Sequence, residues 1–121
     1  MFRLGIIEES LIDKEVLEKL KPYYISQRLQ NIPEDQFPIW HINEYHVDDS
    51  IIENLLDILK GQIKKTWYCH AFSNEKMYVI LNGKWFEVSF ERNSTWDNMI
   101  DYGTNVAGVE PFFLENIPLY I

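Results

Sequence analysis

The stretch TWYCHAFSNEKMYVILNGKWFEVSF, residues 66–90, decides the fold. It holds three runs of β-branched and aromatic residues separated by two turn signals, a pattern that predicts three consecutive antiparallel strands. Asn82-Gly83 separates the second run from the third and supplies the positive φ angles of a type I′ turn. A hairpin centred there pairs Val79 with Phe86 and Ile80 with Trp85, which fixes its register.

Alternation along these strands gives the hairpin two different faces. One face is apolar and is expected to be core; it carries Met77, Val79, Leu81, Phe86 and Val88. The other face is amphipathic and is expected to be only partly covered; it carries Tyr78, Ile80, Trp85 and Glu87.

The turn Ser73-Asn74-Glu75-Lys76 leaves the first strand's register open. A loop with an even number of residues places His70 opposite Val79, on the apolar face. A three-residue loop shifts the pairing by one residue and moves His70 to the other face.

Length and composition limit the class of protein. A chain of 121 residues with 46% hydrophobic content is expected to form one domain, residues 1–121. The net charge of −8 argues against a nucleic-acid partner or an anionic membrane, because such binding depends on clustered Lys and Arg. A single cysteine excludes an intrachain disulfide, and the first ten residues do not form a signal peptide or a membrane anchor, so a cytoplasmic location is expected.

The N-terminal half is predicted to contain two strands and two helices. A short strand at residues 2–8 is followed by a helix capped by Asp13, which Pro22 interrupts; residues 23–32 are read as a second helical piece with a weak apolar stripe. After the loop at 33–38, residues 39–47 form a strand with two mixed faces, a pattern typical of an edge or a cleft.

The best helix signal in the chain begins at residues 48–50. Ser50 and Glu53 match a capping box, an apolar stripe continues to Ile63, and Gly61 is the expected terminator. This helix is expected to pack on the apolar face of the meander.

A last helix is predicted after the meander, capped by Ser94 or Thr95 and ended by Gly108. Its expected buried residues are Trp96, Met99, Ile100 and Val106, and Gly103 within it suggests close packing. The following residues are unusually apolar, so this tail is expected either to fold against the body or to pair with another copy.

These elements together predict an α+β fold. The expected architecture is a mostly antiparallel sheet with a central three-stranded meander at about 66–90, packed by helices, in the order β-α-β-α-β-β-β-α.

Several stretches resemble a family of small bacterial proteins of unknown function. The resembling segments are PIWHINEYHV at 38–47, DDSIIENLLDILKG at 48–61, TWYCHAF at 66–72, the KMYVILNGKWFEV hairpin and WDNMIDYGTNVAGV at 96–109. The family's pattern is a W-H strand, a capped helix, a W-Y-x-H-F strand, a hairpin and a final helix with Y-G. The run EPFFLEN departs from the family's C-terminal part. The resemblance supports the fold and implies no activity.

The only candidates for chemistry are histidines. His41 and His46 are five residues apart on one strand and therefore point to opposite faces. His41 and His70 would approach if their strands were neighbours joined by a right-handed crossover, and with a carboxylate they would offer a metal or acid–base site. Independent packing of each histidine is the favoured interpretation, so no metal, cofactor or catalytic residue is assigned. Cys69 beside His70 points the other way and is read as a small buried hydrophobic residue.

Aromatic residues are the better candidates for function. The candidate binding surface comprises Trp67, Tyr78, Trp85, Phe112 and Phe113. The chain is therefore predicted to be a small non-enzymatic binding or regulatory protein that contacts another protein or its own copy. One alternative is a small enzyme or divalent-metal protein centred on His41 and His70. Another is an acidic inhibitor or immunity-like protein that docks on a basic partner.

Overall fold

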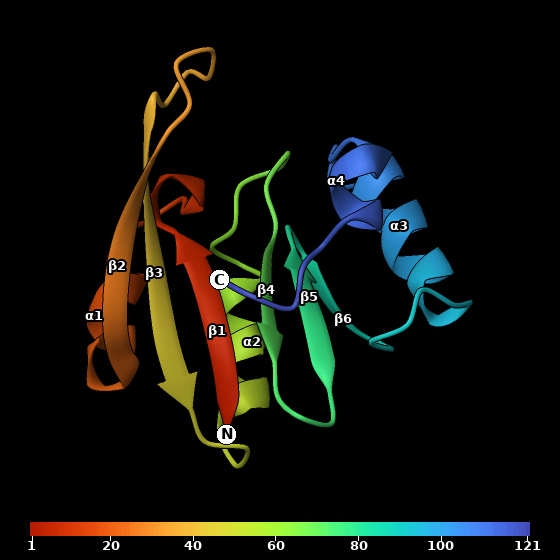
Figure 1. Ribbon diagram of the computed structural model, residues 1–121, viewed down its shortest axis with the longest axis horizontal. Helices are drawn as coiled ribbons and strands as arrows, with labels where there is room; N and C mark the ends of the chain where they lie inside the picture. The colour runs from red at the N-terminus through yellow and green to blue at the C-terminus, as the bar shows by residue number, and fades with distance from the viewer.

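The computed structural model describes residues 1–121 as a six-stranded antiparallel sheet with helices on both faces (Figure 1). The strands are β1 (Phe2–Ile7), β2 (Tyr24–Asn31), β3 (Ile39–Val47), β4 (Cys69–Phe72), β5 (Met77–Leu81) and β6 (Lys84–Val88). They lie in the order β2-β3-β1-β4-β5-β6. The α-helices are α1 (Val16–Leu20), α2 (Ile52–Leu59), α3 (Thr95–Asn105) and α4 (Pro111–Glu115). Two short 3-10 helices span Glu8–Ser10 and Lys21–Tyr23.

The α+β class and the central meander are confirmed. β5 pairs with β6 in the register that the Asn82-Gly83 turn predicts, with Val79 opposite Phe86 and Gly83 at a φ of +93°. β4 pairs with β5 so that His70 lies opposite Val79, which is the register of the even-numbered loop.

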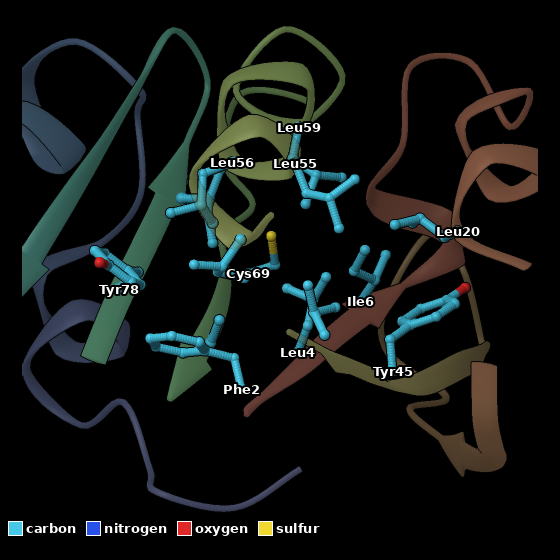
Figure 2. Packing of buried hydrophobic residues seen from close by; sticks show 14 of the residues in the cluster. Phe2, Leu4, Ile6, Leu20, Tyr45, Leu55, Leu56, Leu59, Cys69 and Tyr78 are labelled. Carbon is cyan, nitrogen blue, oxygen red and sulfur yellow. The ribbon is translucent and has the colours of Figure 1, made fainter. Parts of the chain in front are cut away.

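The two faces of the sheet have separate cores. On one side, here called the α2 face, α2 and α1 cover alternate residues of β1, β3, β4 and β5 (Figure 2). Residues whose side chains are buried there include Leu4, Ile6, Tyr45, Leu56, Leu59, Cys69 and Tyr78. On the opposite side, here called the tail face, α3 and α4 cover Met77, Val79 and Leu81.

The expected position of α2 was therefore wrong. This helix packs against Tyr78 and Ile80, which belong to the face that alternation marked as amphipathic. All five residues of β5 are buried, because helices cover the strand from both sides. The capping box also does not form: α2 begins at Ile52 with no side-chain cap, and Ser50 makes no bond to Glu53.

The segment expected to be a second helical piece is strand β2. It pairs with β3 along almost its whole length, with an irregularity between Tyr24 and Ser26. All eight of its residues are exposed, so β2 is an edge strand whose pattern is not shaped by burial.

The last helix and the tail follow the prediction in part. Trp96, Met99 and Gly103 are buried in α3, whereas Val106 is 51% exposed and does not belong to the buried side. Gly103 packs closely, because a Cβ there would overlap Leu114 of α4. The tail folds against the body and adds α4, and residues 118–121 return across β5 and β4 toward β1 (Figure 1).

Candidate functional site

A cavity of about 510 Å³ opens on the tail face beside the β2–β3 hairpin. Its floor includes Gly5 and Ile7 of β1, Ile42 of β3 and His70 of β4. The walls come from β2, the start of β3, the loop before β4, α4 and the C-terminal residues. They include Arg28, Gln30, Trp40, Trp67, Tyr68, Phe113, Pro118, Tyr120 and Ile121. A volume of this size suits a small ligand or one large side chain.

Residues 118–121, here called the strap, form one wall of the cavity. The Nε2–H of His70 donates to the backbone oxygen of Tyr120 at 3.1 Å, and Nε of Arg28 donates to the backbone oxygen of Ile121 at 3.4 Å. Gly5 makes room for the strap, since a Cβ at this position would lie 3.0 Å from two side-chain carbons of Ile121. The strap is thus seated by both backbone and side-chain contacts.

Tryptophans define the apolar side of the cavity. The rings of Trp40 and Trp67 lie 5.0 Å apart, and Phe37 is 6.3 Å from Trp67. The Trp40 indole N–H donates to Oδ2 of Asp35 at 3.3 Å. These contacts link the tip of the hairpin to the loop that precedes β4.

The backbone at Thr66 helps to place Trp67. Thr66 has a φ of +74°, the left-handed region that residues other than glycine rarely occupy. Its backbone N–H donates to the backbone oxygen of Ala107 at 2.8 Å, and the backbone N–H of Trp67 donates to the backbone oxygen of Lys64 at 3.3 Å. Strained backbone held by such bonds is often found at functional sites.

Burial keeps two ionisable groups of the cavity, His70 and Tyr68, neutral. It lowers the pKa of His70 from 6.5 to about 4, against the opposing effect of the Tyr120 and Pro118 carbonyls and with a further contribution from the charge of Arg3. It likewise raises the pKa of Tyr68 to about 12. Tyr68 lines the same cavity as His70.

The five residues of the predicted binding surface separate into two groups. Trp67 and Phe113 line the cavity, and Phe112 lies next to Phe113 with 67% exposure. Tyr78 is only 1% exposed and lies beneath α2, so it cannot contribute to a surface. Trp85 is on the α2 face, where its indole N–H donates to Asp57 at 2.8 Å.

The proposed meeting of His41 and His70 does not occur. β1 lies between β3 and β4 and pairs antiparallel with both, so β3 and β4 run parallel to each other but are not neighbours, and the condition for the two histidines to approach is not met. His41 is on the α2 side of β3, where its Nδ1 lies 2.8 Å from the Glu9 carboxylate. No group of three or more His, Cys, Asp or Glu side chains is arranged to hold a metal ion.

Glu9 and Cys69 are both buried, for different reasons. Burial alone would raise the pKa of Glu9, but hydrogen bonds from the backbone and ring of His41 and from its own backbone hold that pKa below its usual value. Cys69 packs in the α2-face core and burial raises the pKa of its thiol, which confirms the prediction of a small buried residue pointing away from His70.

Sequence reasoning identified part of this cavity. The mixed faces of residues 39–47 indicated an edge or a cleft; β3 is not an edge strand, but Trp40 and Ile42 line the cavity. Arg28 and Tyr68 were not singled out, because the strand β2 was read as a helix and no local pattern connects these residues. Only the β-rich composition of YYIS at 23–26 could have suggested the strand.

No protein-family model, curated protein or solved structure matches this chain. The resemblance to a family of small bacterial proteins stays a prediction. Among the helices of the structure, none has both the length and the apolar character needed to cross a membrane.

Proposed function

We propose that the protein is a non-enzymatic binding protein that holds an apolar side chain of a partner protein in the cavity of the tail face. The observation that carries this proposal is a ready-formed aromatic cavity with an exposed apolar rim. Trp40 and Trp67 line it, and Phe113 and Tyr120 at its edge are 52% and 66% exposed. Anchor side chains that enter such pockets dominate the energy of many protein interfaces.

The rim favours a protein partner over a small molecule alone. Phe112 and Leu119 lie beyond the cavity itself and are also largely exposed. A ligand confined to the cavity would leave them in water, whereas a partner surface would cover them. Phe112 contacts Phe113 of the cavity wall, and Leu119 lies in the chain between two wall residues, Pro118 and Tyr120. Exposed apolar side chains beside a pocket are typical of interaction sites.

The chemistry of the floor supports binding rather than catalysis. His70 is neutral at pH 7 and its Nε2–H is used by Tyr120, while the Cys69 thiol points into the opposite core. Neither residue offers an activated base or nucleophile to a group in the cavity.

Peptide selection tests the proposal without a known partner. A random peptide library is selected on the wild-type protein, and the enriched peptides are measured against Trp67→Ala and Trp85→Ala. Both tryptophans are half-buried, but only Trp67 lines the cavity. We expect Trp67→Ala to weaken binding by about tenfold or more and Trp85→Ala to leave it nearly unchanged. Enriched peptides that bind both variants as well as the wild type would refute the cavity as the site.

A further inference from the structure

We propose that the protein forms a symmetric dimer in which β2 pairs antiparallel with β2 of a second copy, with Leu29 at the two-fold axis. This interface is separate from the cavity's ligand and does not depend on it. It follows from three features of β2: open backbone groups along its outer edge, the lack of the usual edge protection, and side chains that complement themselves in one register.

The outer edge of β2 carries backbone groups that β3 does not bind. In an antiparallel ladder, residues that exchange backbone hydrogen bonds with the neighbouring strand alternate with residues whose N–H and C=O point away from it. The N–H of Ile32 donates to the oxygen of Pro38 at 2.8 Å, so the next pair along, Asn31 with Ile39, is not hydrogen-bonded. By this alternation, three residues of β2 point their backbone groups outward: Gln27, Leu29 and Asn31.

A contact of β3 agrees with this alternation. Leu29 lies opposite His41, and the backbone N–H of His41 donates to Oε1 of Glu9 at 2.7 Å rather than to β2. β2 is the last strand of the sheet and all eight of its residues are exposed, so its edge is accessible. Its outward N–H and C=O groups are therefore available to a further strand.

β2 lacks the devices that usually keep a sheet edge from pairing. Natural edge strands are short, or carry lysine, proline or bulges. β6, at the opposite edge, fits this description, because it has five residues and both Lys84 and Glu87 are exposed. β2 has eight residues and no proline, its only charged residue is Arg28, and its irregularity lies at its start, between Tyr24 and Ser26. Residues 26–31 therefore form a regular, unprotected edge.

One register makes this edge complementary to itself. With the two-fold axis at Leu29, outward-pointing residues pair only with one another, and the Leu29 side chain, which is 62% exposed, meets its own copy. Gln27 then lies opposite Asn31 of the second copy, and Arg28 lies opposite Gln30, so no like charges are opposed. A two-fold axis at Arg28 instead would set two guanidinium groups directly against each other, which is unfavourable.

This pairing has two consequences for the assembly. A two-fold interface uses the β2 edge of both copies, so association stops at the dimer. Because paired residues of an antiparallel ladder lie on the same face, the tail faces of the two copies form one surface on which both cavities open. Arg28 and Gln30, which line the cavity of each copy, then lie beside the second copy.

Complementary charges at residue 29 test this interface. Solution mass is measured by sedimentation equilibrium, up to millimolar concentration, for the wild type, Leu29→Lys, Leu29→Glu and an equimolar mixture of the two variants. We expect the wild type to be a dimer and each variant alone to associate about tenfold more weakly or less, because like charges then oppose each other, and the mixture to restore the dimer. Ile12→Lys adds the same charge at a residue of similar exposure, 59%, outside β2, and should dimerise as the wild type does.

Amide hydrogen exchange identifies the edge itself. The amides of Gln27, Leu29 and Asn31 should be protected in the wild-type dimer and lose that protection in Leu29→Lys. A wild type that stays monomeric would overturn the proposal, and so would a dimer that Leu29→Lys leaves intact, because another surface would then hold it. Since Leu29 is exposed, neither charge enters the core, and a mixture of the two variants that stays monomeric would overturn the pairing of Leu29 with its own copy.

Discussion

The buried histidine beneath the strap makes the stability of the protein depend on pH in a defined way. His70 has a folded-state pKa of about 4 against 6.5 for the unfolded chain, because burial disfavours its charged form. Between these values the unfolded state binds more protons than the folded state, so stability falls as the pH falls. The contribution is fully present above pH 6.5 and is lost progressively toward pH 4.

The size of this effect follows from the two pKa values. From pH 7.5 to pH 5 the linkage relation gives a loss of about 2 kcal/mol in the free energy of unfolding. The carboxylates of Glu9 and Glu44, whose pKa values are lowered by their hydrogen bonds in spite of burial, lose their contribution only as the pH falls below 4.5. A window that ends at pH 5 therefore isolates the histidine from them.

The assay compares the wild type with His70→Gln by urea unfolding at both pH values. Glutamine retains an N–H donor for the Tyr120 oxygen but does not titrate. We expect the wild type to lose about 2 kcal/mol more than His70→Gln between pH 7.5 and pH 5. Because the two proteins differ only at residue 70, the difference between their stability changes reports this position alone. Parallel stability curves for the two proteins would refute the buried, neutral histidine.

Two further predictions concern the strap and the α3–α4 contact. Deletion of residues 118–121 should expose His70 and raise its pKa from about 4 toward 6.5, as followed by an NMR titration of the imidazole; a value that stays near 4 would show that the strap does not bury it. Gly103→Ala should destabilise the protein by about 1 kcal/mol, because overlap with Leu114 outweighs the gain in helix propensity. Gly61→Ala, whose nearest contact is at 3.5 Å, is the matched control and should be neutral or stabilising in the same denaturation assay.

The parts of the fold that sequence predicts are those with strong local signals. Asn82-Gly83 fixes the β5–β6 register through its turn geometry, and the apolar stripe of α2 marks a helix whatever lies beneath it. The partner of that helix could not be predicted, because Tyr78 and Ile80 are buried as fully as Val79. When both faces of a strand are covered, alternation no longer distinguishes them.

The sequence-based predictions failed at strand β2, because its residues are all exposed and burial therefore imposes no alternation of apolar and polar residues. The exposed residues of β2 carry no period-2 signal, and the spacing of Tyr24, Ile25 and Leu29 imitates a helical stripe. Missing that strand also hid the order β2-β3-β1-β4, and with it the separation of His41 from His70. The cavity was only partly predictable because it joins a hairpin, a loop and the strap, which are far apart in the chain.

The indole N–H resonances of the four tryptophans test the central claim most directly. Trp40 and Trp67 line the cavity, while the indoles of Trp85 and Trp96 donate to Asp57 and Ser89 outside it. A ¹H–¹⁵N correlation spectrum is recorded while a selected peptide is added. The account predicts that the Trp40 and Trp67 signals move and the other two do not. Movement confined to Trp85 or Trp96 would contradict it and place the binding surface elsewhere.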